Sequence, residues 1–503
     1  MKKIFIITSI ILITKFSLCQ TLTYNKLYTP YPNNSINTFN ASSIINDGDH
    51  YYFVGYGNDT INSNFQSLIF CKLDSAANVS RKFMLTKAGW NYYPEVQTLK
   101  RCRSGGFLYL GQKDTSNFNP EHILIRFDDN LDTIWTRTIH NNNAEWESFA
   151  EVKETSDNGL IFVGAVEISL NNFGVLLVKT DSCGNQIWRK ILYLPDTRGG
   201  SRIIEMPDKG FLIKGFHETQ VTGDGGPFLV KTDILGNQQW YKDIGGNEYD
   251  GNAAIALTKD SNILVAYGYS TYTFQDNNSW SAKLNVIKYK LDGTEIWNKF
   301  YDTINRSLET LKIQILNDNK IIIMGYYDVD SLFYFSSFLF KINSNGDSLW
   351  NKRYYICKSN LDQNFLLDNE LNSDNGITAC GYVLGHDLNV KQQIWLLKTD
   401  SNGYAPGPQN VGIIDLPCLY VEYGALKVFP NPATTQTTLT FPLLSSQGQL
   451  QVYNMQGQKV YEASIPKNAT QVVLDTKVYE KGLYKVVVSE KGEIRGQASL
   501  IKN

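Results

Sequence analysis

The sequence predicts an all-β fold, a seven-bladed β-propeller followed by a small Ig-like β-sandwich. A unit with the form of Gly174–Lys190, GVLLVKTDSCGNQIWRK, recurs along the chain at intervals of about fifty residues. The segments between turn residues are short and rich in β-branched and aromatic side chains, and helical periodicity is absent. The repeat stops near residue 405, where a segment of different composition begins.

Residues 1–19 are expected to form a secretory signal peptide. Two lysines precede a short apolar run, and Ser17-Leu18-Cys19 precedes Gln20. The run is too short for a membrane span and Lys15 interrupts it, so we expect no transmembrane segment after signal removal. Cleavage after Cys19 is the favoured outcome. A lipid anchor on Cys19 is the alternative, which the bulky Leu18 disfavours.

Composition limits the classes of function. The net charge is −2 and no block of like charge occurs, so nucleic acid is not an expected partner. The six cysteines after the signal form no CxxC pair, and the five histidines are dispersed without ligand spacing, so we expect no metal site. The pairing of any disulfides stays open.

The repeat contains a basic residue, one further residue and an acid or amide, and seven copies are present. They are Lys72-Leu73-Asp74, Arg126-Phe127-Asp128, Lys179-Thr180-Asp181, Lys231-Thr232-Asp233, Lys290-Leu291-Asp292, Lys341-Ile342-Asn343 and Lys398-Thr399-Asp400. Five copies are followed by a tryptophan: Trp135, Trp188, Trp240, Trp297 and Trp350.

Each copy is preceded by a second apolar run that ends on glycine, at Gly55, Gly111, Gly164, Gly215, Gly268, Gly325 and Gly381. A tight-turn signal and another strand-like segment come before that run. Each unit therefore contains four short strands, which is the content of one propeller blade. The propeller is expected to occupy residues 20–405.

The two ends of the repeat array complement one another. The seventh copy lacks a fourth strand and a tryptophan, while Tyr24-Asn25-Lys26-Leu27-Tyr28 resembles Trp297-Asn298-Lys299-Phe300-Tyr301. We expect residues 22–28 to supply the outer strand of the last blade and to close the ring, because closure removes exposed sheet edges. An open solenoid is the alternative.

The KTDxxGNxxW units resemble propeller repeats common in exported proteins of the Bacteroidota. They are also similar to the tryptophan-docking repeats of pyrroloquinoline-quinone enzymes and to the Asp-boxes of sialidases. In those families the acid and the tryptophan brace a turn and pack between blades. The resemblance therefore implies a structural role for Asp181 and Trp188, and no quinone or other cofactor is expected.

Residues 406–424 are expected to form a linker, and residues 425–503 a separate domain. The domain closely resembles the type A C-terminal sorting domain of the type IX secretion system, through Val428–Ala433 (VFPNPA), Leu450–Tyr461 (LQVYNMQGQKVY) and Lys481–Val486 (KGLYKV). The resemblance implies recognition by the translocon and sortase after periplasmic transit. The protein would then be secreted or held at the cell surface. An unrelated Ig-like adhesion module is the alternative.

No catalytic motif is present: HExxH, GxSxG, the P-loop and the EF-hand loop are all absent. The candidate ligand-binding residues come instead from the longer connections, which join the second strand to the third and one blade to the next. These connections should gather on one face of the ring. They contain aromatic residues beside amides and acids, which suit sugars or peptides: Trp90, Tyr93, Trp146, Tyr249 and Trp280.

Three functions remain open at this level. The leading hypothesis is an exported binding protein that engages a glycan, peptide or protein ligand through the long-loop face. One alternative is a hydrolase or lyase that acts on extracellular polysaccharide with carboxylates in the ring's mouth. The other is a structural adhesion component.

Overall fold

The structure is a computed structural model of the 503-residue chain. It describes residues 23–28, 38–59, 65–87, 89–115, 121–139, 146–182, 184–218, 225–245, 250–273, 279–305, 307–328, 335–356, 363–385, 390–405, 409–411, 424–441, 443–444, 446–454, 459–490 and 493–503. The expected signal peptide therefore lies outside the described residues. Within them the regular structure is entirely β, and no helix is long and apolar enough to cross a membrane.

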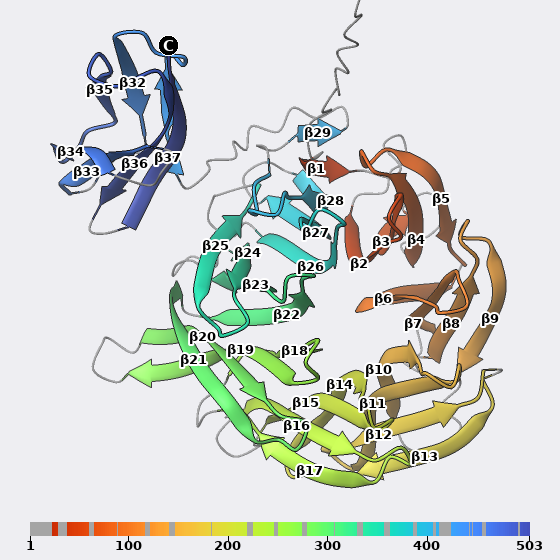
Figure 1. Ribbon diagram of the computed structural model, residues 1–503. Coiled ribbons are helices and arrows are strands. Elements are labelled where there is room, and N and C mark those ends of the chain that lie inside the picture. The colour runs from red at the N-terminus through yellow and green to blue at the C-terminus, as the bar shows by residue number, and fades with distance from the viewer. Residues whose placement is uncertain are drawn as a thin grey trace, which may run out of the picture.

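Figure 1 shows the propeller strands arranged as a ring of blades, with the first strand of each blade nearest the centre. Blades six and seven belong to one sheet, because Phe335 pairs with Gln363. Blade one contains β2 (Phe39–Asn46), β3 (His50–Asp59), β4 (Phe65–Asp74) and β5 (Val79–Leu85). Blade two contains β6 (Trp90–Arg101), β7 (Phe107–Thr115), β8 (Glu121–Phe127) and β9 (Thr133–Ile139). Blade three contains β10 (Glu147–Glu154), β11 (Leu160–Ser169), β12 (Asn172–Thr180) and β13 (Gln186–Leu192).

Blade four contains β14 (Thr197–Glu205), β15 (Phe211–Glu218), β16 (Gly225–Thr232) and β17 (Gln238–Asp243). Blade five contains β18 (Ala254–Leu257), β19 (Ile263–Thr273), β20 (Ser279–Tyr289) and β21 (Glu295–Asn305). Blade six contains β22 (Leu308–Ile315), β23 (Ile321–Asp328), β24 (Phe335–Ile342) and β25 (Ser348–Tyr354). Blade seven contains β26 (Gln363–Leu371), β27 (Ile377–Gly385) and β28 (Val390–Lys398). The prediction of a seven-bladed propeller is confirmed.

The fourth strand of blade seven is β1 (Tyr24–Tyr28), which pairs antiparallel with β28. Tyr24 lies opposite Lys398, the register that Trp188 has opposite Lys179 in blade three. Beyond β1, β29 (Gln409–Val411) adds a parallel strand. The N-terminal strand is therefore held between two segments from the end of the repeat array.

Side chains of β1 contact both its own blade, blade seven, and blade one. Asn25 is fully buried, and its Oδ1 accepts a 2.6 Å hydrogen bond from the Trp395 indole N–H. Lys26 Nζ donates a 2.8 Å hydrogen bond to Ala76 O in blade one. The strand thus joins the last blade to the first through specific polar contacts as well as through its backbone.

The apolar core is divided among the seams between blades. Buried apolar side chains form seven clusters in the propeller, and each cluster is shared by two neighbouring blades. Tyr24 belongs to the cluster between blades seven and one, and Leu27 to the cluster between blades six and seven. Cys71, Cys102 and Cys380 are free and buried.

The recurring acid braces the turn between the third and fourth strands. In blade three, Asp181 accepts hydrogen bonds of 2.8 Å from the backbone N–H and from the side-chain amide of Asn185. The recurring tryptophan crosses to the next blade, where Trp188 lies against Gly236. Gly236 has φ of +77°, and a Cβ there would lie 3.0 Å from the Trp188 ring. The motif is therefore structural, since glycine meets both the turn conformation and the close contact.

The recurring lysine spans its own blade. Lys179 lies 3.0 Å from Asp157, and Lys231 lies 2.7 Å from Asp208, each reaching the turn between the first two strands. In blade five this lysine is Lys288, 3.1 Å from Asp260. The sequence alignment on Lys290-Leu291-Asp292 is therefore wrong by two residues: Lys290 takes the turn position of Asp181, and its backbone makes the same hydrogen bonds.

The glycine that ends the second strand of a blade is required for a different reason. Opposite Gly164, β10 contains a one-residue bulge between Phe149 and Glu151. The bulge brings Ser148 O so close that a Cβ on Gly164 would lie 1.9 Å from it. The same steric conflict recurs at Gly55 against Asn40 O. Glycine is therefore needed opposite the bulges of these two inner strands.

The C-terminal segment folds as a small β-sandwich. One sheet contains β30 (Gly424–Ala425), β37 (Glu493–Lys502), β36 (Gly482–Glu490), β33 (Gly448–Tyr453) and β34 (Lys459–Ile465). The other contains β31 (Lys427–Phe429), β32 (Gln436–Thr440) and β35 (Gln471–Asp475). An apolar cluster that includes Leu439, Val452 and Val486 forms its core.

The role of β1 can be tested by Leu27→Ala in the full chain. Leu27 is 4% exposed, and truncation of a buried leucine costs about 2–5 kcal/mol. We expect calorimetry to show a lower unfolding temperature for the propeller. Ile187→Ala is the matched control, because Ile187 is also an aliphatic residue of an outer strand but is 58% exposed. Equal transitions for the two variants would contradict a stabilising role of β1.

Candidate functional site

The long-loop face is formed by connections that lie mostly outside the described residues, so the strand ends define what can be described there. Trp90 begins β6 and is half-buried. Lys87 and Lys113 place their ammonium groups 4.9 and 4.6 Å from its ring centroid. Lys113 also donates a 2.9 Å hydrogen bond to Thr138 Oγ1. Trp90 is therefore packed by cations of its own blade.

Tyr93 lies three residues further along the same strand. Because side chains alternate along a strand, Tyr93 and Trp90 lie on opposite faces of the sheet. Tyr93 is 37% exposed. Partial burial, followed by the Asp114 carboxylate, raises the pKa of Tyr93. The structure does not bring Trp90 and Tyr93 into one binding surface.

Trp146 is the most accessible of the described candidates, at 43% exposed. Its ring packs edge-on against Phe173, with centroids 5.8 Å apart. The Arg198 guanidinium lies 5.9 Å from the Phe173 ring, and its Nε donates a 3.1 Å hydrogen bond to Glu218. Phe173 and Arg198 were missed from the sequence. The one available signal was that Phe173 follows a polar turn at Asn171-Asn172.

We define the aromatic row as Trp146, Phe173, Arg198 and Glu218. It runs from blade three to blade four and presents an aromatic ring beside a guanidinium and a carboxylate. Two candidates cannot be placed in it: Tyr249 lies outside the described residues, and Trp280 has a described backbone within β20 but no described side chain.

The centre of the ring is occupied by an enlarged bulge of β6. Pro94 pairs with Gly111 and Leu99 with Tyr109, so residues 95–98 face the single residue Leu110. The corresponding bulge has one extra residue in β2, β10, β22 and β26. Figure 1 shows β6 extending toward the centre of the ring. We call residues 95–98 the central insertion.

The central insertion is bonded to blades far from its own. Gln97 has φ of +62° and is 5% exposed. Its side-chain amide donates hydrogen bonds of 3.0 Å to Leu311 O in blade six and 3.1 Å to Leu367 O in blade seven. From blade four, Arg202 donates to Val96 O at 3.3 Å. The insertion therefore fills the middle of the ring.

Charged side chains surround the insertion and neutralise one another. Glu151 is 1% exposed, lies 2.9 Å from Lys100 and accepts a 2.8 Å hydrogen bond from the backbone N–H of Ile203. Burial would raise the pKa of Glu151, but Lys100, Lys153 and Arg202 outweigh burial and lower this pKa to about 2. The carboxylate is therefore a fixed ionised group of the scaffold.

A second buried carboxylate also contacts several blades. Asp368 in blade seven lies 2.8 Å from Lys312 of blade six. It also accepts hydrogen bonds of 3.0 Å from Ser43 Oγ and 2.9 Å from the backbone N–H of Ile44 in blade one. This side chain joins three blades at the inner wall, which accounts for its burial.

Two other carboxyl groups near the centre have pKa values shifted in the opposite direction. Burial raises the pKa of Glu95, with a partial offset from Arg202. Burial also raises the pKa of Glu309, against a hydrogen bond from the Asn252 N–H and the charge of Lys214. Carboxyl groups with raised pKa can act as general acids. Among the described residues, no group of three His, Cys, Asp or Glu side chains is placed to hold a metal ion.

In the C-terminal sandwich, the FPNP segment is fixed to the last strand. The Asn431 amide donates a 2.8 Å hydrogen bond to Ser499 O, and its oxygen accepts one of 2.8 Å from the Ile501 N–H. Residues 427–503 match the family model described as "Secretion system C-terminal sorting domain". The chain carries a type IX sorting domain. The sorting domain confirms the resemblance found in the sequence, and it implies secretion or attachment at the cell surface.

Solved structures similar to the chain share little sequence with it. A protein of unknown function from Dyadobacter fermentans is 10% identical with a TM-score of 0.39, and the match covers 63% of this chain and 98% of that one. The GH93 α-L-arabinofuranosidase of Fusarium graminearum, in complex with arabinobiose, is 10% identical with a TM-score of 0.41, covering 61% and 92%. The polysaccharide lyase Uly1 is 9% identical with a TM-score of 0.40, covering 76% and 98%. No curated protein sequence matches the chain.

The charged inner wall predicts a pH-dependent stability that Glu151→Gln should reduce. Because the pKa of Glu151 is lowered from 4.5 to about 2, ionised Glu151 stabilises the fold above pH 4.5, and this contribution is lost as the pH falls from 4.5 toward 2. Removing the charge leaves Lys100 and Lys153 uncompensated, at a cost of about 3–5 kcal/mol. Urea unfolding at pH 7 and at a series of lower pH values measures both effects.

Asp132→Asn is the control, because Asp132 pairs with Arg81 at the surface, where ion pairs contribute little. We expect this variant to keep the wild-type pH profile. A Glu151→Gln protein with wild-type stability at pH 7 would show that the ion pairs of Glu151 do not support the ring.

Proposed function

We propose that the protein is an exported binding protein that engages an extracellular glycan or protein ligand on the long-loop face of the propeller, outside the outer membrane. The sorting domain supports the route, with the translocon and sortase of the type IX system as partners. The face supports the activity, because its connections differ in length and sequence while those on the opposite face are tight, repeated turns.

The central insertion is the observation that carries this proposal. Gln97 crosses the ring and is bonded to blades six and seven, so backbone and side chains of the protein itself occupy the middle. A ligand therefore meets a propeller whose centre is filled, without an open central channel. The functional surface is consequently the loop face, and the aromatic row is its described part.

The chemistry of the aromatic row suits a sugar or a polar protein surface. An exposed indole edge offers an apolar contact, while Arg198 and Glu218 offer hydrogen-bond donors and acceptors beside it. Aromatic and arginine side chains are also the types that dominate binding energy at protein surfaces. The row therefore supports recognition.

The second candidate function is a polysaccharide hydrolase or lyase, which the raised pKa of Glu95 favours. An experiment can distinguish this enzymatic function from simple binding. Shortening of a bound polysaccharide by the wild-type protein, lost in Glu95→Gln, would establish the enzyme. A polysaccharide that is bound and recovered intact would favour the binding protein.

The binding surface can be tested with the mature full chain on a glycan array, followed by calorimetric titration of any glycan found. We expect Trp146→Ala to weaken binding by about tenfold, which corresponds to loss of one well-placed contact residue. Tyr404→Ala is the control: Tyr404 is 50% exposed and lies in a turn on the opposite face. Unchanged affinity in Trp146→Ala, or an equal loss in both variants, would contradict the assignment.

The export route can be tested in the native host by deleting residues 425–503. We expect the propeller to accumulate in the periplasm, because the domain that the secretion machinery recognises is missing. Immunodetection in periplasmic and external fractions measures the effect. An unrelated folded reporter fused to residues 425–503 should appear outside the cell. Continued external appearance of the truncated propeller would refute the proposed dependence on this domain.

A further inference from the structure

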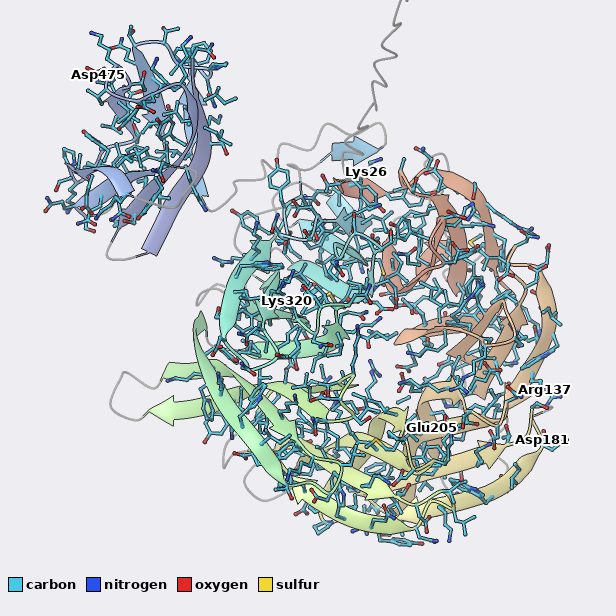
Figure 2. All side chains as sticks on the ribbon, in the orientation of Figure 1. Lys26, Arg137, Asp181, Glu205, Lys320 and Asp475 are labelled. Atoms are coloured by element: carbon cyan, nitrogen blue, oxygen red, sulfur yellow. The ribbon has the colours of Figure 1, made fainter. Side chains whose placement is uncertain are left out.

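We propose that His122 makes the seam between blades two and three sensitive to acid, so that protonation of its imidazole opens the ring at this seam. His122 lies in β8 of blade two, and the group it contacts lies in β10, the inner strand of blade three. Figure 2 labels Arg137 and Asp181, which lie at the outer edge of the ring on either side of this seam. Such a joint does not depend on the function proposed for the long-loop face.

His122 forms a hydrogen bond across the seam. Its Nε2 accepts a 3.0 Å hydrogen bond from the backbone N–H of Phe149, and the two rings pack edge to face with centroids 5.3 Å apart. The bond reaches blade three where the bulge of β10 begins. Beside it, the Gln112 amide donates a 3.2 Å hydrogen bond to Ser148 Oγ. Polar contacts therefore join the two blades at this end of the seam, and His122 supplies one acceptor.

Blade six solves the same problem with a different residue. Ser337 has the position of His122, four residues before the recurring basic residue. Its Oγ accepts a 2.7 Å hydrogen bond from the backbone N–H of Leu366 in blade seven. Leu366 begins the bulge of β26 as Phe149 begins the bulge of β10. A hydroxyl stays neutral between pH 4 and 7, so the histidine adds a titration that the contact itself does not require.

The other blades have no side chain that titrates near neutral pH at this position. With Lys288 as the basic residue of blade five, the equivalents of His122 are Leu68, Val175, Pro227, Leu284, Ser337 and Ile394. A change in protonation at this position can therefore act on the seam between blades two and three alone.

Protonation would break the His122 contact. The Phe149 N–H can only donate, so Nε2 is the acceptor and the proton of the neutral ring is on Nδ1. This Nδ1 is buried and forms no hydrogen bond with any of the described residues. A second proton would go to Nε2 and place two donors 3.0 Å apart, on a charged ring that is 3% exposed. Burial accordingly lowers the pKa of His122 from 6.5 to about 4.

The charged side chains around this contact do not stabilise the protonated ring. On the strands of blades two and three near it, they are Lys113, Asp114, Glu121, Arg137, Glu147, Glu167 and Arg189. Glu121, next to His122, lies 3.2 Å from Lys113, and Glu147 forms an ion pair with Arg189. None of the described carboxylates raises the pKa of His122, which burial alone sets.

The loss of stability has a defined pH range. Because the pKa of His122 is 6.5 in the unfolded chain and about 4 in the ring, the unfolded chain takes up the proton first. Stability is therefore lost as the pH falls from 6.5 toward 4, and the ratio of folded to unfolded protein should drop by about two powers of ten. Glu151 loses its contribution at lower pH, because its pKa is about 2. His122 thus responds to milder acid than Glu151 does.

The first test is urea unfolding of the mature full chain at pH values from 7 to 4. His122→Gln keeps a side-chain acceptor and cannot titrate, and His122→Ser copies the residue of blade six. We expect the folded-to-unfolded ratio of wild type to fall about a hundredfold more than that of either variant between pH 6.5 and 4. His50→Gln is the matched control, because the His50 side chain is 38% exposed, and it should keep the wild-type profile. Parallel profiles of wild type and both His122 variants would overturn the proposal.

The second test locates the opening by amide hydrogen exchange and mass spectrometry at pH 7 and pH 4, corrected for the intrinsic exchange rate. We expect wild-type peptides that contain Phe149 to lose at least tenfold of their protection at pH 4, and peptides that contain Leu366 to keep theirs. In His122→Gln, the Phe149 peptides should stay protected at both pH values. Full protection of Phe149 in wild type at pH 4, or an equal loss at Leu366, would overturn the proposal.

Discussion

The propeller depends on a contact that recurs in several seams: the tryptophan of an outer strand lies against a turn glycine of the next blade. Trp188 meets Gly236, Trp240 meets Gly293 and Trp350 meets Gly403. In each pair the glycine has positive φ, so the turn that offers the backbone also makes room for the ring. The apolar core is divided among seven seams, each shared by two blades, so the packing of every blade depends on the blades beside it. Closure of the ring is consequently a condition for the stability of every blade.

The repeat allowed much of this to be predicted, because local turn chemistry and the aromatic contact recur together. The likeness of Tyr24–Tyr28 to Trp297–Tyr301 extends to register, since Tyr24 faces Lys398 as Trp297 faces Lys288. The alignment was wrong in blade five because a second lysine, Lys290, stands two residues after the structural one. A sequence alignment compares residue types, whereas the turn is defined by the backbone groups that form its hydrogen bonds.

The centre of the ring could not be predicted for a different reason. The sequence of β6 shows a few extra residues between two strand-like runs. Their number does not indicate where in the ring these residues lie. The partners of Gln97 lie 214 and 270 positions away in the chain, and no local pattern indicates contacts of that separation. The same holds for Asp368 and Ser43, which are 325 positions apart. The closed ring determines which residues make long-range polar contacts. These contacts can therefore be predicted only once the arrangement of the ring is known.

The aromatic candidates show a related limit. The sequence placed five aromatic residues in long connections, but exposure is decided by what the neighbouring strands contribute. Lys87 and Lys113 pack around Trp90, whereas Trp146 has only the edge of Phe173 beside it among the ring contacts described. Both residues stand beside a connection and both are tryptophan. Their difference arises from Lys87, which precedes β6, and Lys113 in β7, because both pack around Trp90 and no residue-by-residue search combines them.

Repetition offers a way to locate function that single motifs do not. Where a seam follows the common rule, its residues are core: Trp350 lies against Gly403 of the next blade. Where a seam departs from the rule, the departure needs a cause, because an unfilled seam forfeits packing that neighbouring seams possess. The side chains that break the repeat are therefore better guides to binding than the ones that define it.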